Sequence, residues 1–553
     1  MPNSNNVQSG DAELYEIIDA EWSWRESELG AQTMKATVQD RLPDVEAATH
    51  ERRAKRWAET KSHLDQVDSQ ALSPVARIDF ESYLFQINRF VENARFKTYE
   101  RPATADSAFW RTLAFEAYRL RLNCNEDAEA YLSRLSDFPR YIESQIANMR
   151  SGVDRGFGPP RVCMVGREDP IRAIASARSG ADTPYFLPFE KSRKLFGAEK
   201  LERALRVIET DVIPAFAKLL DFVSNYYFPR LPESIAAIDQ PDGEAYYRSE
   251  LNEYTTTDLS PEAIHEIGKA EVARIQIEMA GVAHEAGFGS DYLKMLDFMK
   301  SEPRFYATTK KQLLGEAAYV CKKFDGVVHD YFGRLPHQRF ALIETPSEIA
   351  RFDTFGRGAP DRYLLNTHNL PSRPLYSLPA LTLHESAPGH SFQMSITEEL
   401  DLRPFRKQYI SAFGEGWGLY VERLGDEMGM YETPFERMGM LSFQMWRAVR
   451  LVVDPGMHAL GWSRDQAQSY LRENTAIAEH EIVTEIDRYI SWPGQASSYY
   501  LGMLQIMNLR REAEESLGER FSLRDFHDKV LSLGCVPLTV LKTSIESWTG
   551  EQK

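Results

Sequence analysis

The chain has 553 residues, of which 43% are hydrophobic, and a formal net charge of −17. This length allows a large hydrophobic core, and the lack of any run of about 18 apolar residues argues against a membrane-spanning protein. The acidic charge and the absence of a dense lysine and arginine run argue against nucleic-acid binding. We therefore expect neither a membrane nor a nucleic acid as a partner.

The N-terminus and the cysteines bear on the compartment. Met1–Asn6 are polar and lack the basic start and apolar core of a secretory signal, so we expect a cytoplasmic protein, or a periplasmic one if a signal peptide has been removed. The cysteines are scattered and are expected to be reduced, mostly buried thiols: Cys124, Cys163, Cys321 and Cys535. Nothing in the sequence decides between a monomer and a homodimer.

Helical periodicity runs through the whole chain and predicts a mainly α fold. Between residues 201 and 223, apolar residues recur every three or four positions, as on the buried face of one long helix. They are Leu201, Leu205, Ile208, Val212, Phe216, Leu219 and Val223.

A domain boundary is predicted where Pro, Asp and Gly cluster, between Pro232 and Gly243. Residues 1–240 would form an N-terminal helical lobe, and residues 241–553 a helical lobe that binds metal and carries the chemistry. The two lobes would flank a deep cleft. One continuous body is the alternative.

A helix is predicted to begin at Ser260, whose hydroxyl is a suitable cap. Pro261 follows at a position where its missing N–H is harmless, and Glu262 lies near the positive end of the helix dipole. His265 lies inside this helix, and we expect it to be packed or solvated rather than a metal ligand.

One short strand is predicted at residues 362–367, where aromatic and apolar residues stand between turn-forming residues. We expect this strand, with Tyr363, to be an edge strand of a small sheet beside the active-site helix. It would bind a substrate or only pack on the helices.

The stretch His384–His390 reads His-Glu-Ser-Ala-Pro-Gly-His and carries the clearest chemical content of the chain. Neutral imidazoles are favoured metal ligands, and catalytic zinc sites usually have three protein ligands. Glu385, beside the first histidine, is placed to take a proton from a metal-activated water. The motif predicts a metallohydrolase; a chance pair of surface or core histidines is the alternative.

The spacing of the two histidines requires a distorted helix. Six residues rotate the second side chain by roughly 240° on a regular helix, away from the first. Pro388 removes a backbone donor and Gly389 tolerates unusual dihedral angles, so this pair is expected to supply the distortion that returns His390 to His384.

A third metal ligand is expected in the segment Ser411–Glu422. Glu415 is the leading candidate, because the glycines beside it allow close helix approach. Glu422 lies seven residues on, nearly two turns, so both carboxylates share one helical face. Glu422 would orient a histidine, or else pair with Arg423 or another surface cation.

Several later residues are weaker candidates for substrate binding. Arg488 would bind a substrate carboxylate or pair with Glu485 or Asp487. His458 would donate to the oxyanion or to substrate, or else cap a turn, and Gln495 would contact substrate or fix the turn that precedes it.

These residues carry a resemblance. His384–His390, Glu415–Trp417 and Arg488–Tyr499 resemble the bacterial family known as domain of unknown function 885. Thr255–Gly268 and Gln145–Gly156 are similar to the middle and N-terminal parts of that family, so the likeness covers most of the chain.

The resemblance implies a helical zinc peptidase related to thimet oligopeptidase, angiotensin-converting enzyme and carboxypeptidase Taq, with one zinc ion per chain and a short peptide substrate. In those relatives a Glu beyond the motif completes the zinc site, and Glu415 stands 25 residues after His390. They also place a Tyr against the tetrahedral intermediate, which the pattern Pro-Gly-Gln-Ala-x-x-Tyr assigns to Tyr499 rather than to Tyr500.

The resulting hypothesis is a zinc-dependent metallopeptidase in which Glu385 is the base and Tyr499 stabilises the oxyanion. A metal-dependent amide hydrolase acting on a non-peptide small molecule and a non-catalytic binding protein on the same fold are the alternatives. Manganese, cobalt or iron would suit the same two-His, one-carboxylate set. The metal ligands of the hypothesis are His384, His390 and Glu415.

Overall fold

The protein consists of two compact units that are mainly helical. The computed structural model describes residues 9–30, 38–105, 107–351, 354–475, 477 and 479–552. The first unit comprises residues 1–246 and 490–492, and the second comprises residues 247–489 and 493–553. The division at residue 246 falls close to the boundary predicted after residue 240, but the sequence did not predict that Ile490–Trp492 belong to the first unit.

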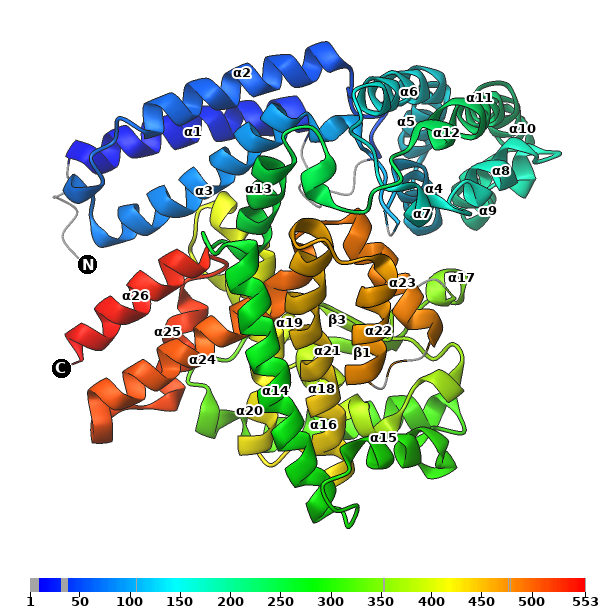
Figure 1. Ribbon diagram of the computed structural model, residues 1–553. Helices are drawn as coiled ribbons and strands as arrows, with labels where there is room; N and C mark the ends of the chain where they lie inside the picture. Colours follow the sequence, from blue (N-terminus) through cyan, green and yellow to red (C-terminus); the bar gives the residue numbers. More distant parts are fainter. Residues whose placement is uncertain are drawn as a thin grey trace. The chain divides into compact units, whose positions relative to one another are not determined.

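The first unit contains α1 to α12. The segments from α4 onward pack around an aromatic-rich core that includes Trp110, Phe138, Tyr185, Phe216 and Tyr227. Figure 1 shows α1, α2 and α3 lying side by side. The helices are α1 (Ser9–Leu29), α2 (Ala47–Leu64), α3 (Pro74–Phe96), α4 (Phe109–Arg119), α5 (Asn125–Ser136), α6 (Phe138–Asp154), α7 (Arg161–Met164), α8 (Asp169–Ala175), α9 (Leu187–Lys191), α10 (Ala198–Val207), α11 (Ile213–Phe222) and α12 (Phe228–Arg230).

The long helix predicted between residues 201 and 223 is confirmed, with one difference. α10, α11 and α12 follow one another without leaving helical conformation, but two π-helical segments, Ile208–Val212 and Val223–Tyr227, join them. The apolar side chains of the predicted face are buried or partly buried in the core of the first unit.

The second unit contains the remaining helices and the strands. α14 and α21 lie lengthwise against each other (Figure 1), in close approach at Gly268, where a β-carbon would lie 2.7 Å from the side chain of Leu451. The helices are α13 (Gly243–Thr255, which begins in the first unit), α14 (Pro261–Glu285), α15 (Tyr292–Ser301), α16 (Lys310–Tyr331), α17 (Ser347–Ala350), α18 (Leu378–Glu385), α19 (His390–Glu399), α20 (Ser411–Glu427), α21 (Pro434–Ala459), α22 (Arg464–Asn474), α23 (Glu479–Ser491), α24 (Ser498–Leu517), α25 (Leu523–Ser532) and α26 (Leu538–Glu551).

The predicted start of α14 is confirmed. The Ser260 hydroxyl accepts a hydrogen bond from the Ala263 N–H at 3.2 Å, and Pro261 is the first helical residue. His265 is buried, and its Nδ1 atom lies 2.9 Å from the carbonyl oxygen of Val452, so it is a packed histidine as expected.

The small sheet has three strands in the order β1 (Ala341–Glu344), β3 (Arg362–Leu365) and β2 (Gly356–Ala359). β3 runs parallel to β1 and antiparallel to β2. The predicted strand is therefore present, but the expectation that it is an edge strand is wrong, because the short strand β1 pairs with its other side. β2 is the edge strand that packs on α18 and α19.

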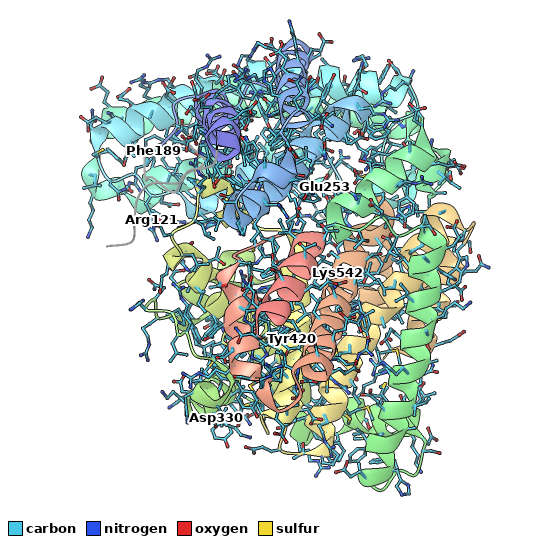
Figure 2. The ribbon with its side chains drawn as sticks, turned by 90° about the vertical axis from the view of Figure 1, so that its left-hand side faces the viewer. Arg121, Phe189, Glu253, Asp330, Tyr420 and Lys542 are labelled. Carbon is cyan, nitrogen blue, oxygen red and sulfur yellow. The ribbon has the colours of Figure 1, made fainter. Side chains whose placement is uncertain are left out.

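His527 on α25 is a buried histidine that is expected to make stability depend on pH. Its Nδ1 atom donates to the Tyr331 carbonyl at 2.9 Å, and its Nε2 atom accepts from the hydroxyl of Tyr420 at 2.7 Å. Figure 2 shows Tyr420 within the second unit. Burial lowers the pKa of His527 to about 3. The folded chain therefore holds this imidazole neutral.

We predict that acid destabilises the protein through His527. Between pH 6.5 and about 3 the unfolded chain binds one more proton at this position than the folded chain. The free energy of unfolding should therefore fall by about 1.4 kcal/mol for each pH unit below 6.5. Denaturant unfolding with a chelator at pH 7, 6 and 5 measures the slope, which the variant His527→Gln should reduce. Equal slopes in both proteins would contradict the assignment.

Candidate metal centre

The loop between α18 and α19 brings the two motif histidines together. α18 ends at Glu385, the chain leaves helical conformation, and α19 begins at His390. The Gly389 N–H donates to the carbonyl oxygen of Leu383 at 2.9 Å. A β-carbon on Gly389 would lie 1.9 Å from the carbonyl oxygen of His384, so only glycine fits there. The rings of His384 and His390 are 4.7 Å apart, and the predicted helix distortion is confirmed.

Glu415 on α20 faces both histidines. Its Oε2 atom lies 3.5 Å from Nε2 of His384 and 3.6 Å from Nε2 of His390. The three candidate ligand atoms all lie within 4.8 Å of one another. Both histidines are buried, whereas the Glu415 side chain is 17% exposed. Two imidazole nitrogens and one carboxylate oxygen therefore converge on one point.

Three glycines of α20 allow these contacts. A β-carbon on Gly418 would lie 2.6 to 2.9 Å from atoms of the His384 ring, and one on Gly414 would lie 2.2 Å from the ring of Tyr409. Gly416 faces Gly502 of α24: a β-carbon on Gly416 would lie 2.5 Å from backbone atoms of Gly502. The close helix approach expected beside Glu415 is therefore present, and two of the three glycines make room for side chains of the site.

Glu422 orients His384. Its Oε1 atom accepts a hydrogen bond from Nδ1 of His384 at 2.7 Å, which directs Nε2 of that ring towards Glu415. The alternative pairing with Arg423 does not occur, because Arg423 pairs with Glu278. A carboxylate on the outer nitrogen of a metal-binding histidine fixes its tautomer and ring orientation.

The buried charges of the centre stabilise one another. Burial by itself lowers the pKa of His384, but its hydrogen bonds with Glu415 and Glu422 outweigh burial and raise that pKa to about 10. Burial by itself raises the pKa of Glu415, but His390 and His384 hold it well below its usual range. The carboxylate of Glu415 is therefore ionised, as a metal ligand must be.

The carboxylate of Glu385 is held by the edge strand. Its Oε2 atom accepts a hydrogen bond from the N–H of Gly358 in β2 at 2.7 Å. A β-carbon on Gly358 would lie 2.2 Å from the carbonyl oxygen of Glu385 and 2.6 Å from Cβ of His390. Gly358 was not predicted from the sequence, although the pattern Gly-x-Gly at residues 356–358 could have indicated a close backbone contact there.

Tyr499 and Tyr500 have different surroundings. The hydroxyl of Tyr500 donates to Glu271 at 2.9 Å, on α14 and away from the metal centre. Tyr499 stacks on Arg450, and its pKa is raised first by burial and then by the charge of Glu415. Of these two adjacent tyrosines, Tyr499 is therefore the one whose hydroxyl feels the charge of Glu415.

Tyr409 contacts the candidate ligand Glu415, which was not predicted from the sequence. Its hydroxyl donates to Oε1 of Glu415 at 2.8 Å, which leaves Oε2 facing the histidines. Tyr409 lies in no recognisable motif. Gly414, which leaves room for the Tyr409 ring, was the one indication in the sequence that a side chain packs closely there.

Two predicted site residues do not reach the centre. Tyr363 is fully buried, because its side chain points to the face of the sheet that packs against Leu378 and Leu381 of α18. His458 is also fully buried at the end of α21, where its Nε2 atom lies 3.0 Å from the carbonyl oxygen of Tyr489. Both residues stabilise packing instead of contacting a substrate.

Arg488 and Gln495 lie next to each other beside Tyr499. Arg488 donates to Oε1 of Gln495 at 2.9 Å and pairs with Glu485 at 3.2 Å, one of the two pairings considered for it. Gln495 also hydrogen-bonds Tyr499, which partly opposes the rise in the Tyr499 pKa caused by burial, so the three residues form one cluster. A role for Arg488 in binding a substrate carboxylate stays a prediction.

Comparisons with known proteins place the chain among bacterial proteins. A family described as "Bacterial protein of unknown function (DUF885)" matches residues 25–545. A putative lipoprotein from Colwellia psychrerythraea has a similar crystal structure, with 24% identity, a TM-score of 0.87 and coverage of 99% of this chain and 100% of that one. A putative lipoprotein of unknown function from Shewanella oneidensis has 16% identity, a TM-score of 0.69 and coverage of 97% and 99%. No curated protein matches.

We predict that Gly418→Ala disrupts the centre without unfolding α20. The added β-carbon would lie 2.6 Å from the His384 ring and displace it, while alanine favours the helix by about 1 kcal/mol. Isothermal titration with zinc should show weaker binding than in the wild type. Gly281→Ala on α14, where a β-carbon meets nothing within 4 Å, is the matched control. Equal zinc affinity in Gly418→Ala and the wild type would disprove the role of Gly418.

Proposed function

The chain belongs to the bacterial family of unknown function DUF885, and we propose that this member is a zinc-dependent metallohydrolase that cleaves peptide bonds of short peptides. The observation that supports this proposal most strongly is the convergence of the ligand atoms of His384, His390 and Glu415 within 4.8 Å of one another. The charge of Glu385 also acts on His384.

The donor atoms fit a catalytic zinc ion. Such sites have three protein ligands, commonly two imidazole nitrogens and one carboxylate oxygen, and keep one position open. His384 presents Nε2 because Glu422 accepts from its Nδ1 atom, and Glu415 presents Oε2 because Tyr409 donates to Oε1. Manganese, cobalt or iron would also suit this set, and zinc is preferred through the resemblance to zinc peptidases.

The proposed chemistry assigns a role to each neighbouring residue. A bound zinc ion supplies a Lewis acid that activates water and polarises the carbonyl group of the scissile bond. Glu385 would take the proton from the attacking water and deliver it to the nitrogen of the leaving amine. The Gly358 N–H holds one oxygen of this carboxylate in place. The Tyr499 hydroxyl would donate to the oxyanion.

Strand addition to β2 would bind the peptide. β2 is an edge strand, it lies beside α18, and Gly358 within it contacts the motif backbone. Edge strands bind extended peptides through main-chain hydrogen bonds, which read the sequence weakly. Peptide binding by strand addition, which was suggested for residues 362–367, is therefore proposed for residues 356–359 instead.

We also propose a location in the cell envelope rather than the cytoplasm. Both solved structures reported above are described as putative lipoproteins. Among the described helices, none has the length and apolar character needed to cross a bilayer. Recovery of the protein in the membrane or periplasmic fraction of its bacterial host would support this location, and recovery in the cytoplasmic fraction alone would refute it.

Removal of the base should separate catalysis from metal binding. We expect Glu385→Gln to lower kcat by about 10²- to 10⁴-fold, because general-base catalysis contributes that much. Its zinc content should remain at the wild-type level, whereas His390→Ala should lose zinc. Elemental mass spectrometry and cleavage of a mixed peptide library provide the two measurements. Loss of zinc from Glu385→Gln would mean that Glu385 is a ligand. A wild type with zinc but no peptide cleavage would favour a non-peptide amide substrate, and one without either would favour a binding protein.

The adjacent tyrosines provide a matched test of oxyanion stabilisation. Tyr499→Phe should lower kcat by about 10²- to 10³-fold with little change in KM, because the lost hydrogen bond acts in the transition state. Tyr500→Phe removes a hydroxyl that binds Glu271 and should leave kcat near the wild-type value. Equal kcat values in the two variants would disprove the assignment to Tyr499.

A further inference from the structure

The carboxylate of Glu422 is a fully buried negative charge that holds one of the two candidate histidine ligands. Its Oε1 atom accepts from His384, and its Oε2 atom is buried without a hydrogen-bond partner among the described residues. His390 has no comparable support, because its Nδ1 atom is also buried without such a partner. The orientation of His384 therefore depends on Glu422, and a buried carboxylate is costly unless a positive charge compensates it.

Arg447 provides that positive charge. Its NH2 nitrogen lies 4.0 Å from Oε1 of Glu422, and the side chain is 10% exposed. In the part of the chain that the structure describes, His384 and Arg447 are the basic residues that pair with Glu422. The guanidinium of Arg447 is the permanently charged group beside this carboxylate, because arginine does not lose its proton in proteins.

The guanidinium of Arg447 is held in this position by its own helix. It stacks over the rings of Phe443 and Trp446, at 4.7 and 5.2 Å from their centroids, and donates to the carbonyl oxygen of Phe443 at 3.3 Å. These contacts leave it at a distance from Glu422 at which charge attraction acts without a direct hydrogen bond.

Neighbouring arginines do not share this role. Arg450, three residues later on α21, pairs with Glu485 at 3.2 Å and donates to Tyr489 at 2.8 Å. Arg423, next to Glu422 in sequence, pairs with Glu278 on α14. Arg447 is thus distinguished from them by its position against the carboxylate that orients His384.

We propose that Arg447 is a positioning residue of the metal centre: it compensates the buried charge of Glu422, which in turn holds Nδ1 of His384 and directs Nε2 to the metal. This inference rests on the proposed zinc centre. It adds Arg447 of α21 to the residues of α20 that support the centre. Groups that support metal ligands in this way typically contribute about 10- to 100-fold to metal affinity or activity.

A double-mutant cycle tests the inference in the full-length protein. Arg447→Met removes the charge at similar length, Glu422→Gln removes the charge that it balances, and the double variant removes both. The dissociation constant for zinc is measured for each by competition with a chelator at fixed pH and salt. Arg437→Met is the matched control, because it removes an arginine of the same helix that pairs with Glu285.

We expect Arg447→Met to weaken zinc binding by about 10- to 100-fold, and the double variant to bind no more weakly than Glu422→Gln alone. Arg447→Lys, which keeps the charge, should retain most of the affinity, and Arg437→Met should match the wild type. Independent losses that multiply in the double variant would overturn the proposal, as would unchanged affinity in Arg447→Met. If Arg447→Met does not fold, the lysine variant and the double variant carry the comparison.

A measurement without zinc separates this inference from the proposed function. In metal-free protein labelled with ¹⁵N-histidine, the Nδ1–H signal of His384, assigned through His384→Gln, reports its hydrogen bond to Glu422. Arg447→Met should shift or broaden this signal, and Arg437→Met should not. Absence of zinc binding in the wild type would refute the proposed function while this signal still tests Arg447. An unchanged signal would overturn the positioning role.

Discussion

The His384 imidazole lies flat against α20, and the rest of the centre depends on this contact. Gly418 lies beneath the ring, and any side chain there would occupy the space that the ring occupies. Glu415 lies one turn before Gly418 and Glu422 one turn after it, so that Nε2 and Nδ1 of the same ring each meet a carboxylate. One helix therefore supplies a ligand, orients another ligand and provides the surface on which that ligand rests.

All the contacts of the centre lie within the second unit. α18 and α19 present the two histidines, α20 presents Glu415, α24 presents Tyr499, and β2 holds the carboxylate of Glu385. Trp417 connects two of these parts, since its indole N–H donates to the carbonyl oxygen of Pro388 at 2.8 Å and so fixes the interrupted motif on α20.

Local patterns predicted the helical fold and the interruption of the motif helix, because each depends on short-range geometry. Glu415 was expected as the third ligand from the glycines beside it and from the resemblance to zinc peptidases. His384 and His390 are six residues apart, and Glu415 and Glu422 share one helical face. The errors concern long-range contacts. β3 became a central strand because β1, more than 15 residues earlier, pairs with it. Tyr363 is buried because α18 covers its face of the sheet. His458 turned towards Tyr489, and the contacts of Gly358, Tyr409 and Arg447 depend on tertiary packing that no local pattern encodes.

The three glycines at residues 414, 416 and 418 also have a consequence for folding. Each costs a helix about 1 kcal/mol relative to alanine, so together they weaken α20 by about 3 kcal/mol as an isolated helix. In proteins, most of the stability of a helix comes from tertiary packing rather than from the helix propensity of its residues. α20 must therefore acquire its stability from α24, Tyr409 and His384 as they pack against it. The carboxylate of Glu415 is presented only after these parts have assembled, so a partly folded chain lacks the complete set of ligands.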